Sequence, residues 1–262
     1  IGAAPVGVFL MLRRMSLTGD AMAHAILPGA AIGYLFAGLS LPAMTMGGLV
    51  AGLAVALGAG ALARASVLKE DATLAALYLI SLAVGVLIVS ARGSSVDLLH
   101  VLFGSVLALD NETMFLLATV STVSLITFAV IYRPLVLECT DPGFLRSVSA
   151  SGAFAHLAFM GLVVLNLVGG FHALGTLLAV GIMMLPAAAA RHWTDEATRL
   201  IGLAALFGVI ASIAGLLLSY HGELPSGPAI ILAAGVLYAG SVLFGSAGGL
   251  VWKWIPGRHL EA

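Results

Sequence analysis

The sequence predicts an all-α integral membrane protein, a polytopic bundle of about eight to nine transmembrane helices. Of the 262 residues, 61% are hydrophobic and only 9% are charged, whereas a soluble domain carries about 25% charged residues. The mean hydropathy is +1.14. The apolar residues also fall in runs of about 20 residues, the length that a helix needs to cross a bilayer. A chain with so little charge requires lipid as its solvent.

Eight apolar segments are predicted to span the membrane, and no linker separates them into domains, so residues 1–262 are expected to form one transmembrane domain. They are Ala21–Gly38, Ala43–Ala63, Thr73–Ala91, Met114–Tyr132, Ala153–Leu174, Gly175–Ala190, Leu200–Tyr220 and Gly227–Val251. Ile1–Leu12 precedes them and is shorter than a span, so we expect a truncated N-terminus. Val96–Leu109 is apolar but short, which favours a re-entrant segment covered by neighbouring helices.

Basic residues follow every second apolar segment, counted from Ile1–Leu12. They are Arg13, Arg14, Arg64, Lys69, Arg133, Arg146, Arg191, Arg199, Lys253 and Arg258. The connections Leu39–Pro42 and His221–Ser226 carry no Lys or Arg, and Arg92 is the exception to the alternation. Because cytoplasmic loops are enriched in Lys and Arg, we predict that the basic connections are cytoplasmic and that His221–Ser226 lies outside.

Several function classes are excluded by what the sequence lacks. The net charge of -1 gives no basic field for nucleic acid. The sequence contains no G-x-x-x-x-G-K-[ST], so this chain does not hydrolyse ATP through a P-loop. It also lacks H-E-x-x-H and G-x-S-x-G, the signatures of zinc metalloproteases and of serine hydrolases. We therefore expect a chain that is not itself an enzyme.

Asp20 and His24 are ionisable residues within or beside a predicted span, in LTGDAMAHAILPG. An ionisable residue at membrane depth is a functional candidate. Their spacing of four places both side chains on one helix face, and a carboxylate and an imidazole both ligate Zn²⁺ and Mn²⁺. The competing interpretation is that Asp20 caps a helix and His24 bonds to the backbone.

Three further residues are weaker metal candidates, because each lies in a predicted outer turn where a solvated loop is the competing interpretation. They are His221 and Glu223 in YHGELPSG, and His172 in GGFHALGT. On the predicted cytoplasmic face, Glu138–Gly152 is polar. Asp141 as N-cap with Pro142 at the first helical position predicts a short helix there.

Leu12–Gly33 (LRRMSLTGDAMAHAILPGAAIG) resembles the permeases of metal-ion ABC importers, which take up zinc, manganese or iron. The resemblance continues through VDLLHVLFGSVLAL, DPGF, LGTLLAVGIMMLPAAAAR and LLLSYHGELPSGPAIIL, so it covers essentially the whole chain in order. It implies a fold similar to the cobalamin-type ABC importer permeases. It also implies a homodimer in the bacterial inner membrane, with the pathway on the two-fold axis. Two copies of a cytoplasmic ATP-binding subunit and an extracytoplasmic metal-binding protein are the implied partners.

The resemblance also implies roles for particular residues. Asp20 and His24 match the paired acidic and imidazole positions of the metal pathway. DPGF matches the start of the segment that couples to the ATPase, here residues 138–152, and Asp141, Pro142, Phe144 and Arg146 are the expected contacts. Gly143 departs from the pattern, since relatives often carry an acidic residue there. We expect no permanently bound cofactor. The transported ion is expected to be Zn²⁺, favoured by the histidines, with Mn²⁺ next.

Two other functions are weighed against the importer permease. A secondary transporter driven by an ion gradient is expected to contain internal repeats, and the two halves of the sequence have no convincing similarity. An intramembrane metalloenzyme built on Asp20 and His24 would need a further ligand and a general base nearby, and the sequence offers neither.

Overall fold

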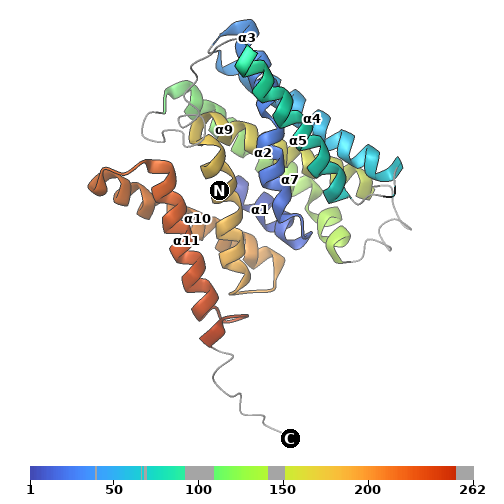
Figure 1. Ribbon diagram of the computed structural model, residues 1–262. Coiled ribbons are helices and arrows are strands. Elements are labelled where there is room, and N and C mark those ends of the chain that lie inside the picture. Colours follow the sequence, from blue (N-terminus) through green and yellow to red (C-terminus); the bar gives the residue numbers. More distant parts are fainter. Residues whose placement is uncertain (39, 66, 68–69, 92–108, 141–150, 252–262) are drawn as a thin grey trace, which may run out of the picture.

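The computed structural model describes residues 1–251 apart from positions 39, 66, 68–69, 92–108 and 141–150. The described residues form helices and no strand, which confirms the all-α class (Figure 1). The helices are α1 (Ala3–Leu12), α2 (Ser16–Ala25), α3 (Leu27–Ala37), α4 (Leu41–Ala65), α5 (Glu70–Ala91), α7 (Asn111–Thr140), α9 (Ser151–Arg191), α10 (Ala197–Gly222) and α11 (Ser226–Phe244).

Eight helical segments in the described part of the chain are long and apolar enough to cross a membrane, and they correspond to the eight predicted segments. The surface of the bundle carries large apolar side chains that water would not favour. Phe36, Phe115 and Val236 are exposed at 89%, 76% and 72%. Lipid tails are the medium in which such a surface is stable, so the prediction of a polytopic membrane bundle is confirmed.

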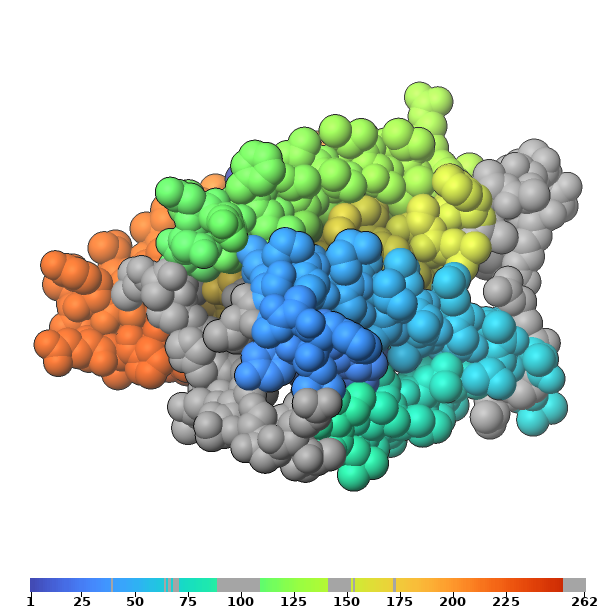
Figure 2. Space-filling view, turned by 90° about the horizontal axis from the view of Figure 1, so that it is seen from above, coloured from blue at the N-terminus to red at the C-terminus, as the bar shows by residue number. Residues whose placement is uncertain are grey.

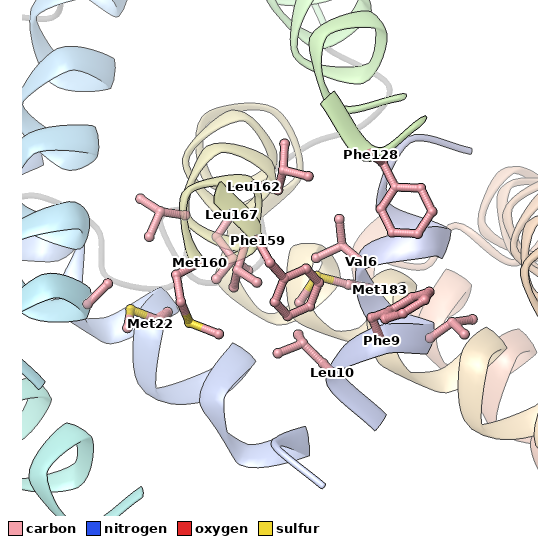
Figure 3. Close-up of a cluster of buried hydrophobic side chains, with 14 of the residues drawn as sticks. Val6, Phe9, Leu10, Met22, Phe128, Phe159, Met160, Leu162, Leu167 and Met183 are labelled. Carbon is pink, nitrogen blue, oxygen red and sulfur yellow. The ribbon is translucent and has the colours of Figure 1, made fainter. Parts of the chain in front are cut away.

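The helix α9 lies at the centre of the bundle and packs against α1, α2, α4, α7, α10 and α11. Figure 2 shows its first half between α7 and α4. The core beside it contains an aromatic cluster drawn in Figure 3, in which the ring of Phe9 lies 5.2 Å from that of Phe128 and 6.4 Å from that of Phe159. Met22 and Met183 are fully buried in the same core, as expected of packing residues.

A glycine divides α9 into two spans. Gly175 has a φ of 78°, a left-handed conformation that glycine adopts without steric cost. A Cβ placed on Gly170 would lie 2.7 Å from the Cβ of Ala179, although residues nine apart in a straight helix are separated by about 13 Å. The chain therefore bends back sharply at Gly175, and the predicted boundary between the two spans at this residue is confirmed.

Two predicted helix ends differ from the structure. The helix α7 continues past the predicted end at Tyr132, through Pro134, to Thr140. A proline removes one backbone hydrogen bond. The helix α7 continues in spite of this loss, because the turns on either side of Pro134 are regular. At 30 residues, α7 is about 45 Å long and exceeds the roughly 30 Å hydrocarbon core. The helix α11 ends at Phe244 and not at Val251, because Gly245 leaves the helical conformation.

The structure brings together helix ends that the charge pattern assigns to one side of the membrane. Arg13, directly after α1, bonds Glu138 near the end of α7 at 2.8 Å. Trp193, directly after α9, donates its indole N–H to Ser241 near the end of α11 at 3.0 Å. These contacts agree with the predicted alternation. The assignment of this end to the cytoplasm remains a prediction.

Small residues allow α3 and α4 to touch through their backbones. A Cβ on Gly47 would lie 2.1 Å from the carbonyl oxygen of Gly29, and a Cβ on Gly33 would lie 2.4 Å from that of Ala43. Such close approach is the usual way in which membrane helices gain packing energy, because lipid provides no hydrophobic drive between them.

Gly47→Ala is expected to separate α3 from α4 and to lower the melting temperature of the purified protein in detergent, since overpacking costs about 1–3 kcal/mol. Gly202→Ala on α10 is the matched control, because a Cβ there meets no atom within 4 Å. Equal melting temperatures for the two variants would contradict the close packing of α3 and α4.

The predicted topology is tested by labelling single cysteines in whole cells with an impermeant thiol reagent. The background is Cys139→Ala, which removes the only cysteine. Gly222→Cys, at the exposed end of α10, should react in intact cells, whereas Asp195→Cys should react only after the cells are opened. The reverse pattern would invert the orientation.

Candidate metal pathway

A tight turn joins α1 to α2 and sets the direction of the helix that carries the candidate ligands. Arg14 has a φ of 59°. Its N–H bonds the carbonyl of Met11, and the N–H of Met15 bonds the carbonyl of Leu10, which is the Schellman pattern of a helix C-terminus. A left-handed conformation costs a non-glycine residue roughly 1–2 kcal/mol. Packing of the following helix α2 against α9 and α5 offsets that cost.

Asp20 and His24 both lie on α2 and face the same side, as the spacing of four predicts. The Nε2 atom of His24 lies 3.8 Å from Oδ1 of Asp20. This separation is too long for a hydrogen bond, and it is close to the roughly 3.4 Å between two ligands of one tetrahedral zinc ion. The carboxylate and the imidazole can therefore contact one cation with a small adjustment of their rotamers.

The interpretation of Asp20 as a helix cap is wrong. The helix α2 begins at Ser16 with Met15 at the N-cap position, so Asp20 lies in the middle of the helix. His24 is not held by the backbone either, since its Nδ1 is buried and has no hydrogen-bond partner among the described residues. Its ring stacks against Tyr78 of α5, with the centroids 6.4 Å apart.

The helical hydrogen bonds are interrupted after Ala25, where α2 ends and Ile26 leads directly into α3. Pro28 occupies the first turn of α3 and has no N–H to donate to the carbonyl of residue 24, so the hydrogen-bond ladder is interrupted there. The hydroxyl of Ser81 on α5 donates to the carbonyl of Ala25 at 2.9 Å. Broken helices at membrane depth persist only where other groups satisfy the backbone, and here α5 supplies that group next to the candidate ligand.

A pocket of about 250 Å³ opens beside Asp20 between α2 and α5. Its polar lining includes Arg14, Asp20, Asp71 and Tyr78. Asp71 lies in the first turn of α5 and is exposed. The sequence analysis did not identify Asp71 and Tyr78. No pattern in the sequence shows that residues near the start of one span lie next to another span about 50 positions away.

The weaker metal candidates are not gathered around Asp20. Among the described residues, no group of three or more His, Cys, Asp or Glu side chains could hold a metal ion. His221 is exposed at the end of α10, where its Nδ1 lies 2.9 Å from the carbonyl oxygen of Leu217. Glu223 follows with a left-handed φ of 51°. The side chain of His172 lies outside the part that the structure describes.

The expected coupling residues fall in a part of the chain that is not described. Asp141, Pro142, Phe144 and Arg146 lie within 141–150, and the predicted re-entrant segment lies almost entirely within 92–108. The structure does place the helices that flank the coupling segment. The helix α7 ends at Thr140 and α9 begins at Ser151, so both belong to the end of the bundle that carries Arg13.

The chain is similar to known transport proteins over nearly its whole length. Residues 1–245 match the model of the ABC 3 transport family. The chain is 33% identical over 257 residues to the manganese transport system membrane protein MntC of Halalkalibacterium halodurans, which covers 98% of this chain and 87% of the relative. It is 32% identical to the manganese import system permease protein ScaB of Streptococcus parasanguinis, over 91% of this chain and 84% of the relative.

Another relative, from Haemophilus influenzae, is described as a probable iron transport system membrane protein and is 30% identical over 94% of this chain and 86% of its own length. Among solved structures, PsaBC from Streptococcus pneumoniae in complex with Fab superimposes with a TM-score of 0.82 and 31% identity, covering 94% of this chain and 88% of that chain. The chain therefore belongs to the ABC 3 transport family and is a metal-ion ABC importer permease, a multi-pass protein of the bacterial membrane.

Proposed function

We propose that this permease imports manganese in an ATP-driven complex and that Asp20 and His24 bind the ion in transit. The observation that carries this proposal is the pair itself. A carboxylate and an imidazole lie 3.8 Å apart on one face of α2, about one turn before Pro28 interrupts the helical hydrogen bonds of the span. Discontinuous helices are a recurring way to build ion sites at membrane depth.

The environment of Asp20 supports a wet pathway. Its side chain is 67% exposed on the surface of this chain. Asp20 lies in the second turn of the span that begins at Ser16, and a charged side chain facing hydrocarbon is costly, so the carboxylate requires a partner or water. The pocket beside Asp20 provides such a space, and Asp71 adds a second carboxylate there, toward the predicted cytoplasmic end of the route.

A homodimer completes the coordination. One chain contributes two ligands, and no third ligand joins them among the described residues. Two chains related by a two-fold axis through this face would present two carboxylates and two imidazoles. Four such ligands satisfy tetrahedral Zn²⁺, and Mn²⁺ accepts the same donors with water in its remaining positions. A pathway site must also bind weakly enough to release the ion.

The ion is proposed to be manganese ahead of zinc. The zinc expectation depended on three histidines, of which only His24 lies beside a carboxylate that could share a cation. Two relatives named above are described as manganese transport proteins, and one as an iron transport protein. Oxygen and nitrogen donors without thiolate suit manganese, so the donor set at Asp20 and His24 supports this choice.

The energy for import comes from partner subunits in this proposal. Two ATP-binding subunits dock on the cytoplasmic face against residues 138–152, with Phe144 inserted into the ATPase. An extracytoplasmic protein delivers the metal to the opposite face. Membership of an ABC importer family supports both kinds of partner, and the two-copy stoichiometry follows from the proposed dimer.

Asp20→Asn and His24→Ala are each expected to reduce Mn²⁺ uptake to background in cells that lack other manganese importers. Asp20→Asn preserves size and removes the charge, and His24→Ala removes the imidazole, so each deletes two of the four proposed ligands from the dimer. Uptake of radioactive Mn²⁺ is the measurement. The assembled complex should still form and hydrolyse some ATP.

Asp195→Asn is the matched control, since this carboxylate pairs with Arg191 at the exposed end of α9 and lies outside the proposed pathway. It should transport at the wild-type rate. Wild-type uptake by Asp20→Asn would remove the metal-ligand role from α2. Competition by unlabelled Zn²⁺, Mn²⁺ and Fe²⁺ in the same assay ranks the metals, and stronger competition by Zn²⁺ than by Mn²⁺ would overturn the choice of manganese.

A further inference from the structure

Three polar side chains from distant parts of the sequence meet at the end of the bundle that is predicted to be cytoplasmic. The Nη2 atom of Arg13 donates to Oε1 of Glu138 at 2.8 Å and lies 2.7 Å from Nδ1 of His156. The side chains are 11%, 20% and 20% exposed. The guanidinium also lies over the ring of Phe159, 5.3 Å from its centroid. The group of Arg13, Glu138 and His156 is called the arginine clamp below.

The guanidinium of Arg13 is the donor in both contacts of the clamp. Arginine carries only donors, so Nδ1 of His156 is the acceptor in this contact. Arg13 and Glu138 then form one charge-assisted pair, the stronger class of hydrogen bond. Nη1 of Arg13 and Oε2 of Glu138 are buried without a partner among the described residues. The clamp therefore buries polar atoms, two of them without a partner, at a place where apolar side chains would have packed the helices together.

The clamp joins three helix ends that lie next to the proposed functional segments. Glu138 lies two residues before the end of α7 and His156 lies in the second turn of α9, so they flank residues 141–150 on either side. Arg13 lies at the C-cap of α1, at the start of the tight turn that leads into α2. Asp20 follows seven residues later, in the second turn of α2.

We propose that Arg13 is a positioning residue that couples the ATPase-docking segment to the metal-binding helix. Arg13 connects the end of α7 and the start of α9, which flank residues 141–150, to the turn from which α2 starts. This inference rests on the proposed function, since it takes that segment as the ATPase contact and Asp20 with His24 as the metal ligands. A displacement of α7 and α9 at this end is transmitted through the guanidinium to α2.

The turn between α1 and α2 is suited to transmit such a displacement. Its Schellman hydrogen bonds from Arg14 and Met15 fix the backbone, so a pull on Arg13 moves the start of α2 as a unit. The ring of Phe9 on α1 packs against that of Phe159 on α9, so the two helices are in contact near the clamp. A role in stability alone is the competing explanation, and the two differ in what the removal of the clamp does to energy coupling.

The experiment measures Mn²⁺ import and ATP hydrolysis together, with the full-length permease assembled with its ATP-binding subunit and metal-binding protein in liposomes. The readout is Mn²⁺ transported per ATP hydrolysed. Arg13→Gln and Glu138→Gln should each lower this ratio by about fivefold or more, the lower end of coupling between linked sites. Arg13→Lys retains the charge beside Glu138 and should restore most of the ratio.

The matched control is Arg199→Gln, which breaks an exposed arginine–glutamate pair, Arg199 with Glu196 at 2.7 Å, and should leave the ratio at the wild-type value. If Arg13→Gln does not assemble, Glu138→Gln and Arg13→Lys give the same comparison. An unchanged ratio in the assembled clamp variants, with import and hydrolysis falling together, would overturn this inference alone. No Mn²⁺ import by the wild-type complex would overturn the proposed function and the inference with it.

Discussion

The absence of hydrogen-bond partners in hydrocarbon is the constraint on which this structure depends. Every backbone N–H and C=O at membrane depth must be satisfied within the protein, so the described chain is helical throughout its spans and each interruption has an identifiable cause. Gly175 provides the left-handed conformation that reverses α9. Pro28 interrupts the ladder after His24, and the hydroxyl of Ser81 satisfies the neighbouring carbonyl.

The same constraint relates packing to function. Because lipid does not drive apolar helices together, close contact through Gly29 and Gly47 holds α3 on α4, and α5 lies against the outside of α2 and α3. That arrangement positions Tyr78 against His24 and Ser81 against the break. Asp20, on the same face of α2 as His24, remains largely exposed beside the pocket between α2 and α5. In the proposed function, this exposed carboxylate marks the face on which a second copy of the chain or water completes the metal site.

Much of this arrangement can be predicted from the sequence. The remainder depends on contacts and backbone conformations that no local sequence pattern indicates. Hydropathy located the eight spans, and the spacing of four placed Asp20 and His24 on one face. Local pattern could not reveal the contact of Arg13 with Glu138 and His156, which lie 125 and 143 positions away. Nor could it reveal the left-handed Arg14, because glycine normally marks such a turn. The predicted end of the span at Tyr132 was wrong for α7, because the apolar run stops before Arg133 whereas the helix continues through Pro134 to Thr140.

The central claim is that Asp20 and His24 of two chains bind one Mn²⁺, and pulsed EPR of Mn²⁺ bound to the purified complex tests it most directly. Imidazole coordination gives a nitrogen coupling on the Mn²⁺ signal. The account predicts one Mn²⁺ for every two permease chains, with nitrogen coupling in the wild type that is lost in His24→Ala. Nitrogen coupling that persists in His24→Ala, or bound Mn²⁺ without nitrogen coupling in the wild type, would contradict it.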